Sequence, residues 1–162
     1  MNPTIERVVL GLTNGPGAEV AMRHAIELAK ASQAELVGMA IVDTKMLENV
    51  GPVPIGGNYY AARLRNTLIT KARHRLAEAV QSFERVAKQA GISFSVSVEE
   101  GDPAPILRER LGKGVALVLP RRSWFDHGLA ERRIDPATWL ARHRIGTVEH
   151  RDEDDAPLVV FG

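Results

Sequence analysis

The chain has 162 residues, 44% of them hydrophobic, which is enough for one domain with a buried core and too few for two comfortable ones. Its 21 basic and 20 acidic side chains leave a formal charge of +1, so there is no overall attraction to nucleic acid or to an anionic membrane. There is no cysteine, which excludes disulfides, iron–sulfur clusters, thiolate zinc sites and thiol catalysis.

The first nine residues, MNPTIERVV, lack the basic segment and apolar stretch of a signal peptide. No run approaches the roughly 20 apolar residues that a membrane-spanning helix needs. We therefore expect a soluble, cytoplasmic protein with a single domain over residues 1–162 and no membrane partner.

The stretch Ile5–Ala31 predicts a buried strand, a glycine-rich turn and an amphipathic helix. The apolar run Val8–Leu10 is typical of a strand covered on both faces, as in a parallel sheet. The turn Asn14–Gly17 interrupts it, and apolar residues then recur at helical spacing. Doubly wound α/β domains receive phosphates at such a turn, but the turn also serves simply to reverse the chain, and we favour that second interpretation.

Glu35–Asp43 is a second apolar run rich in β-branched residues and predicts the next strand. Asn49–Tyr60 holds two prolines and three glycines, which predicts a long loop. From Ala61 to Ala90 a helical pattern resumes, and Gly91 is placed to end this helix.

Ile92–Glu99 alternates apolar and polar residues, which predicts a strand towards an edge of the sheet. Asp102 can cap a short helix over Pro103–Leu111, since proline fits the first helical position. Val115–Leu119 predicts a central strand. This alternation of strands and helices favours an α/β fold with a parallel sheet and right-handed crossovers.

Beyond Pro120 the pattern is less regular, and only Pro136–His143, capped by Asp135, predicts a helix. How residues Arg121–Asp155 fold is left open. The terminal APLVVFG predicts a last strand, which either closes the sheet or pairs with another subunit.

Taken in order, VVLGLTNGPGAEVAMRHAIELAKASQAELVGMAIVD, GPVPIGGNYYAA, GDPAPIL, VALVLPRR and APLVVF resemble the universal stress protein family over nearly the full length. The resemblance implies a Rossmann-like, parallel five-stranded sheet flanked by helices, of the adenine nucleotide alpha hydrolase-like type. It also implies a homodimer joined through the last strand, here Pro157–Phe161.

Members of this family that bind ATP carry an aspartate at the end of strand one, where this chain has Thr13. They also carry a glycine motif after strand four, G-x-x-G, nine residues, then G-[ST], whose amides hold the phosphates. Here Pro120, which has no amide hydrogen, and Ser123 occupy the first two glycine positions, and Gly128 and Gly146 stand at the wrong spacing. We expect no cofactor, with ATP as the alternative. If a nucleotide binds, the resemblance and the turn place it near Leu12, Thr13, Asn14, Gly15, Ile41, Arg121 and Arg122.

Ile41 matches a position that lines the adenine pocket in the binding members, but an isoleucine there is more simply explained as core. No H-x-x-x-H or H-E-x-x-H pair occurs, so no metal site is expected. Ser123 stands in no G-x-S-x-G elbow, so hydrolase chemistry has no support. The histidines are His24, His74, His127, His143 and His150.

The segment after Pro120 is basic and carries aromatic residues, among them Trp124, Phe125 and Trp139. Such a segment can bind a nucleotide or single-stranded nucleic acid by stacking and charge. We favour a solvated face whose aromatics pack on the sheet or across a dimer contact, because neighbouring acidic residues offset the charge. No nucleic-acid partner is expected.

The leading hypothesis is a non-catalytic stress-response or regulatory protein that acts through dimerisation or a protein partner. The alternative is an adenine-nucleotide-binding module that uses the amides of Asn14–Gly17 and the side chains of Arg121 and Arg122. An enzyme on a related fold ranks last, since no catalytic constellation is recognisable.

Overall fold

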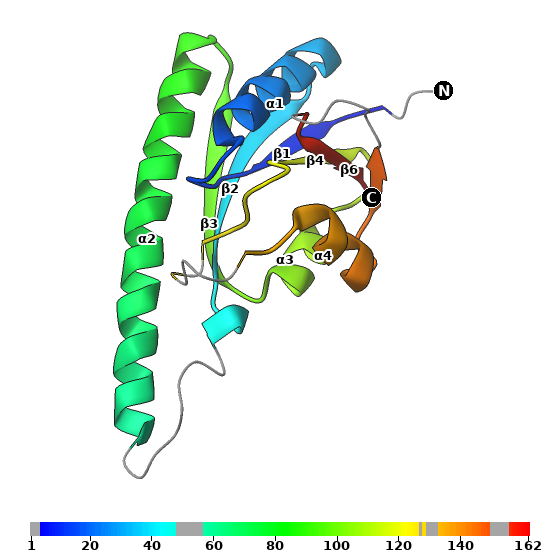
Figure 1. Cartoon of the computed structure of the whole chain (residues 1–162). Helices are drawn as coiled ribbons and strands as arrows, with labels where there is room; N and C mark the ends of the chain where they lie inside the picture. Colours follow the sequence, from blue (N-terminus) through cyan, green and yellow to red (C-terminus); the bar gives the residue numbers. More distant parts are fainter. Residues whose placement is uncertain (1–3, 48–56, 127, 129–132, 150–155) are drawn as a thin grey trace.

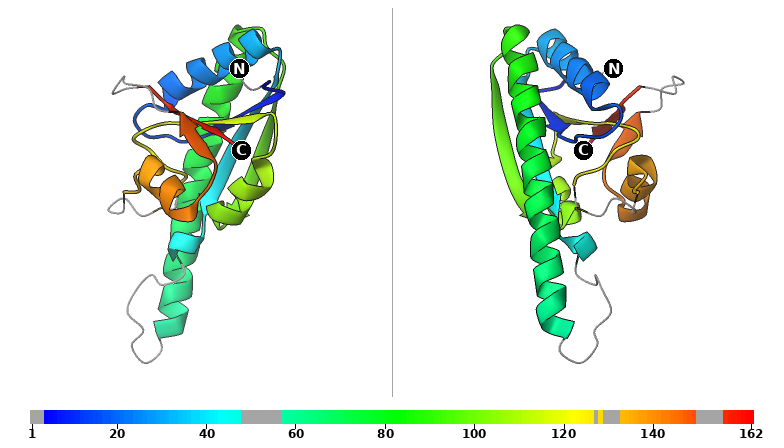
Figure 2. Two further views of the ribbon diagram at one scale, coloured as in Figure 1. Left: turned by 90° about the vertical axis from the view of Figure 1, so that its right-hand side faces the viewer. Right: turned by 60° about the vertical axis from the view of Figure 1, so that its left-hand side comes forward.

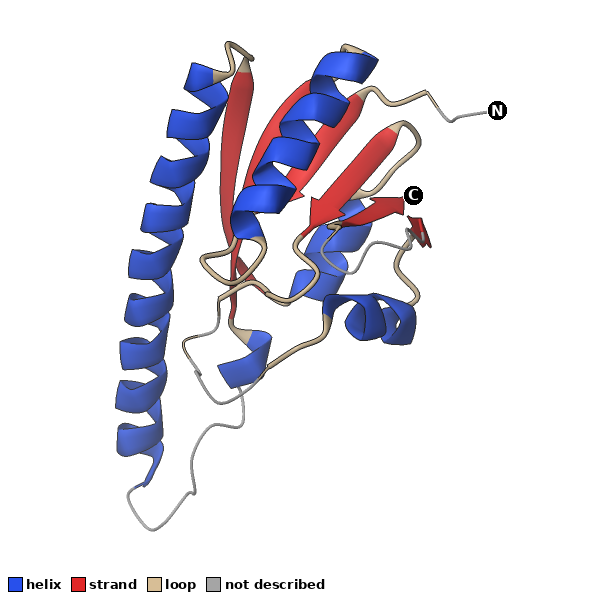
Figure 3. Cartoon of the chain, turned by 45° about the horizontal axis from the view of Figure 1, so that its top comes forward, coloured by secondary structure: helices blue, strands red, loops and turns tan. Residues whose placement is uncertain are grey.

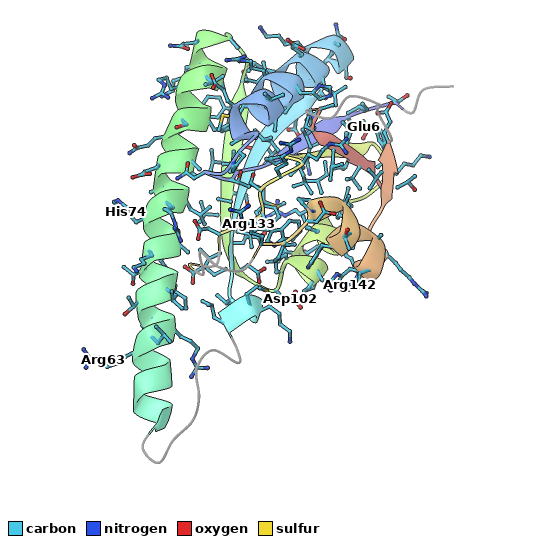
Figure 4. The ribbon with its side chains drawn as sticks, viewed as in Figure 1. Glu6, Arg63, His74, Asp102, Arg133 and Arg142 are labelled. Carbon is cyan, nitrogen blue, oxygen red and sulfur yellow. The ribbon has the colours of Figure 1, made fainter. Side chains whose placement is uncertain are left out.

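The structure is a computed structural model that describes residues 4–47, 57–126, 128, 133–149 and 156–162. One sheet with strand order β3-β2-β1-β4-β6-β5 forms its centre (Figures 1 and 3). The elements, in chain order, are β1 (Arg7–Gly11), α1 (Ala18–Ser32), β2 (Glu35–Asp43), a 3₁₀ turn (Lys45–Leu47), α2 (Gly57–Gln89), β3 (Phe94–Gly101), α3 (Pro103–Arg110), β4 (Val115–Leu119), α4 (Pro136–His143), β5 (Thr147–Glu149) and β6 (Leu158–Phe161).

The α/β fold is confirmed, but the prediction of five parallel strands is wrong in detail. Four strands, β3, β2, β1 and β4, are parallel, while β6 runs antiparallel to β4 and β5 antiparallel to β6. The extra strand β5 has only three residues, Thr147–Glu149, which is too short to show a periodic pattern in the sequence. The sheet is therefore mixed and has six strands.

The terminal strand β6 joins the sheet of its own chain, the first of the two possibilities left open, but it lies between β4 and β5 and does not form the edge. Its register pairs Leu158 with Leu119 of β4, and Val159 with Glu149 of β5. Both backbone edges of β6 are thus occupied within the same chain. The homodimer contact through Pro157–Phe161 stays a prediction, but β6 offers no free edge for it in this arrangement.

Helices cover the two faces of the sheet, α1 and α2 on one face and α3 and α4 on the other (Figure 2). Side chains alternate between the faces along a strand, so Val8 and Leu10 of β1 pack in the cluster under α1 and α2, while Val9 packs in the cluster under α3 and α4. The continuous apolar runs of β1 and β4 are explained by this burial on both sides.

Several predicted helix ends are confirmed by their capping groups. The side chain of Asp102 accepts a hydrogen bond from the amide of Ala104 at 3.1 Å, and that of Asp135 accepts one from the amide of Thr138 at 3.1 Å. Gly91, with φ of 70°, follows the C-terminus of α2. These local signals set the boundaries because each needs only neighbouring residues.

The long helix begins earlier than predicted. Gly57–Tyr60, assigned to the loop, are helical, because extending an existing helix is much easier than starting one. The remainder of that loop, residues 49–56, lies outside the described residues. No helix in the described part of the chain is both long enough and apolar enough to span a membrane.

Candidate functional site

The strand order reverses between β1 and β4, which places a crevice outside the carboxyl ends of these two strands. In open α/β sheets this is where ligands bind, since the loops leaving the two strands diverge. Residues Leu12–Gly15 follow β1 there, and residues 120–126 follow β4. The candidate site is the meeting point of these two loops.

Thr13 and Ser123 are in direct contact at this point. Their side-chain oxygens lie 2.7 Å apart and share a hydrogen bond, and only 3% of Thr13 is exposed. Ser123 also lies against Gly15, because a Cβ added to Gly15 would come within 2.4 Å of the Ser123 Cβ. Two of the positions at which the sequence departs from the ATP-binding pattern, Thr13 and Ser123, are therefore bonded to each other.

The next two residues continue into the crevice. The indole Nε1 of Trp124 donates a hydrogen bond to Oδ2 of Asp43, 3.2 Å away at the end of β2. Phe125 is 1% exposed and packs in the same cluster as Ile41. Its ring reaches β1, since a Cβ on Gly11 would lie 3.1 Å from the Phe125 Cζ. We call Ser123–Asp126 the crevice segment.

Asp126 anchors the crevice segment to α2 and β2. Its Oδ1 accepts hydrogen bonds from Nη2 of Arg75 at 2.9 Å and from the amide of Gly128 at 2.8 Å. Nε of Arg75 lies 2.7 Å from Oδ2 as an ion pair, although its angle is outside hydrogen-bond geometry. The carbonyl of Asp126 accepts a bond from the amide of Asp43 at 2.9 Å. Both α2 and β2 therefore hold the segment.

Removing this anchor is expected to weaken the fold measurably. Asp126→Ala deletes the partner of a half-buried arginine, and we expect a loss of about 1–3 kcal/mol in the free energy of unfolding. Asp126→Asn is the matched control and should lose less, because its side-chain oxygen can still accept from Arg75 and Gly128. Urea unfolding of both variants measures this. An Asp126→Ala protein within about 0.5 kcal/mol of the parent would contradict the anchoring role.

The aromatic residues after Pro120 pack on one another. The ring centroids of Trp124 and Trp139 are 4.5 Å apart, and Trp139 stacks on His143 at 4.1 Å with an interplanar angle of 25°. Trp124 also contacts Phe125 edge to face at 5.0 Å. These rings bridge the crevice segment and α4, as the interpretation of this region as packed aromatics predicts.

The residues predicted around a nucleotide are only partly brought together. Thr13 and Gly15 meet at Ser123, whereas Leu12 and Ile41 are buried in the clusters on opposite faces of the sheet. Asn14 donates through its side-chain amide to the carbonyl of Arg75 at 2.6 Å.

Of the two arginines of that prediction, Arg121 bonds away from the turn. Nε of Arg121 donates to the carbonyl of Ala156 at 2.9 Å, just before β6, and Arg122 is an exposed residue. The side chains of Asn14 and Arg121 are thus engaged with different parts of the fold.

Sequence reasoning missed the crevice segment as a unit. Arg75 and Asp126 are 51 residues apart, and no local pattern pairs them. For Asp43 the available signal was an aspartate that ends an apolar strand. For Ser123 the available signal was a serine where the ATP-binding members carry a glycine. A side chain at this position indicates that the space is filled, and it also keeps a phosphate from coming close to the backbone amide.

The crevice as it stands does not fit a triphosphate in the family manner. In that manner the segment after β4 would offer its amides to the phosphates, but Pro120 has no amide hydrogen to donate, and Ser123 carries a side chain that lies against Gly15. In the described residues, no group of three or more His, Asp or Glu side chains is arranged to hold a metal ion. The arrangement is that of an internally packed crevice.

Comparison with known proteins identifies the fold. The model of the universal stress protein family matches residues 4–119. Universal stress protein UspA from Lactobacillus plantarum superposes with a TM-score of 0.52 at 12% identity, covering 88% of this chain and 94% of that chain, which shows a shared fold. The hypothetical protein MJ0577 gives a TM-score of 0.45 at 13% identity, covering 66% and 67%. No curated protein matches the sequence. The family match ends at Leu119, so the crevice segment lies just beyond it.

Proposed function

The chain belongs to the universal stress protein family, and we therefore propose that it acts in the cytoplasm as a non-catalytic regulator of the stress response that works without an adenine nucleotide. The observation that carries this proposal is the crevice segment, which takes the place at the carboxyl ends of β1 and β4 where a ligand would bind. The bond between Thr13 and Ser123 is its centre.

The cost of opening the crevice can be compared with the affinity that a nucleotide would need. Exposing Phe125 alone costs about 1.5–3 kcal/mol, and each broken hydrogen bond adds about 0.5–1.5 kcal/mol. An opening cost of about 4 kcal/mol lowers the apparent affinity roughly a thousandfold, because only the open fraction binds. A nucleotide site of ordinary affinity would then be weakened beyond use at cellular concentrations.

The proposal that the protein is non-catalytic rests on the same packing. Asp43, which bonds to the crevice segment, and Asp126, which is part of it, are each held by hydrogen bonds from neighbouring protein groups. Neither is presented to an open space as a general base would be. We infer that the protein acts through its surface, by dimerisation or by binding a protein partner.

Thermal unfolding with and without 1 mM ATP and magnesium tests the nucleotide part. If ATP were present at a hundred times its Kd, its binding would add about 2.7 kcal/mol to the free energy of unfolding and raise Tm by several degrees. We expect no shift, and we expect native mass spectrometry of the purified protein to show no mass added by a bound nucleotide.

The variant Thr13→Asp with Ser123→Gly is the matched comparison, because it returns both positions to the pattern of the ATP-binding members. It should bind ATP more tightly than the parent. A reproducible shift in the parent would instead support the nucleotide-binding alternative, and Arg121→Ala with Arg122→Ala would then be expected to abolish it.

A further inference from the structure

The sheet ends in two unlike edges. At one end stands β5, which has three residues, and at the other stands β3, which has eight. Within the described residues β3 pairs only with β2, so its outer side carries a row of unpaired backbone groups. It contains no proline and no lysine, the residues that usually protect such an edge from pairing. Its two carboxylates, Glu99 and Glu100, stand near its end.

The register shows which groups of β3 point outward. The amide of Thr44 donates to the carbonyl of Gly101 at 3.1 Å, and Gly101 is the partner of Asp43 in β2. In a parallel pair every second residue directs both its backbone groups to one neighbour. Ser97 and the other odd-numbered residues therefore bond to β2, and the backbone groups of Phe94, Val96, Val98 and Glu100 face outward.

An apolar groove accompanies this edge. It has a volume of about 380 Å³ and lies between α2 and the end of β2 and β3. Ala77 and Val80 of α2 line it together with Val98, which is 63% exposed although it is a valine in a sheet. Arg73 and Glu84 of α2 also line the groove and carry opposite charges.

We propose that β3 pairs antiparallel with β3 of a second copy of this chain, about a two-fold axis at Ser97, so that one sheet runs through the dimer. This register uses every outward-facing backbone group from Phe94 to Glu100. It sets Val96 opposite the partner subunit's Val98, a β-branched cross-strand pair on the α2 side. It sets Ser95 opposite the partner subunit's Glu99, and no two like charges stand directly opposite.

The same two-fold axis also gives a favourable arrangement of α2 and its copy in the second chain. Phe83 packs edge to face on Phe94 with centroids 5.4 Å apart, and Nη2 of Arg73 donates to Oε2 of Glu100 at 2.8 Å. The middle of α2, between residues 73 and 83, therefore lies beside Ser97. The rotation that pairs the strands lays α2 antiparallel to its copy, with Arg73 level with the partner subunit's Glu84.

Charge complementarity thus identifies the occupant as a second copy. Arg73 is held beside the groove by its hydrogen bond to Glu100, and this bond lowers the pKa of the Glu100 carboxyl. An unrelated extended peptide would gain the backbone bonds at β3 but not the two reciprocal contacts of Arg73 with Glu84. The self-complementary pattern is what distinguishes a dimer from strand addition by another protein.

Because the chain has no cysteine, a single introduced thiol reports on the axis. Ser97 faces its own copy in a pair without hydrogen bonds between them, where the Cα atoms are about 4.5 Å apart and a disulfide can form. Ser97→Cys should give a covalent dimer on mild oxidation, seen on a non-reducing gel. Ser95→Cys is the matched control, since its copies are about 13 Å apart along the strands and should stay uncrosslinked. Equal crosslinking of the two variants would overturn the register.

Sedimentation velocity of the unmodified chain and of Val98→Pro tests the interface itself. We expect the unmodified chain to be a dimer and Val98→Pro to be a monomer with a nearly unchanged Tm, because the amide of Val98 faces outward and bonds to no strand of its own chain. Val98→Lys, which keeps the backbone intact, should likewise be a monomer. A monomeric unmodified chain at about 100 µM, or a dimer that survives both substitutions, would overturn the proposal. A dimer that persists in Val98→Pro and Val98→Lys but is lost when Val148 of β5 is changed would place the interface at the other edge of the sheet.

Discussion

Replacing Phe125 by alanine is expected to lower the free energy of unfolding by about 3–5 kcal/mol. Phe125 is 1% exposed and packs with Ile41 and Leu119 between the crevice segment and the sheet. Alanine would leave a cavity under the crevice segment, whose other anchors hold the backbone in place and limit its collapse. For a domain of this size the loss corresponds to a fall in Tm of about 6–20 °C.

Calorimetry or urea unfolding would measure the effect of Phe125→Ala. Val20→Ala is the matched control, because Val20 is 44% exposed on α1 and its truncation should stay within about 0.5 kcal/mol of the parent. A Phe125→Ala protein as stable as the Val20→Ala control would show that the segment does not pack into the crevice in solution. The proposed lack of nucleotide binding would then lose its physical basis.

The second large effect is expected at the glycine turn. Gly15→Ala would place a methyl group 2.4 Å from the Cβ of Ser123, closer than two carbon atoms can approach without displacement. Overpacking of this kind costs about 1–3 kcal/mol. Ser123→Gly removes the opposing atoms, so Gly15→Ala should cost much less in that background.

A double-mutant cycle over Gly15 and Ser123 measures this dependence. We expect a coupling of at least about 1 kcal/mol between the two substitutions, within the range found for residues in contact. Gly17, where φ is 82°, is the control position: alanine there should be unfavourable for backbone reasons and should not couple to Ser123. Additive effects at Gly15 and Ser123 would mean that the two loops are not in contact.

Much of the fold follows from patterns within single elements. The helix Pro136–His143 and its cap, the strand Glu35–Asp43 and the edge position of β3 are confirmed as predicted. The errors lie where local signals are weak: the three-residue strand β5, and the start of α2 at Gly57–Tyr60, where the length of the helix overrides low propensity.

The candidate site was predicted as a set of positions but not as a set of contacts. Thr13 and Ser123 could be singled out because they replace residues that ATP-binding relatives carry. Their hydrogen bond to each other joins residues 110 apart in the chain, and no spacing rule predicts such a pair. The same holds for Trp124, whose indole reaches Asp43 over 81 residues.

The sequence by itself determined the order of strands and helices apart from β5, two of the helix caps, the buried parallel core and the family, because each of these depends on neighbouring residues or on a long ordered pattern. Only the tertiary structure decided that β6 is enclosed between β4 and β5, that the crevice is filled by the chain itself and that β3 keeps a free edge. These features depend on which surfaces remain uncovered once the layers have packed, and that is a property of the whole assembly of elements in space.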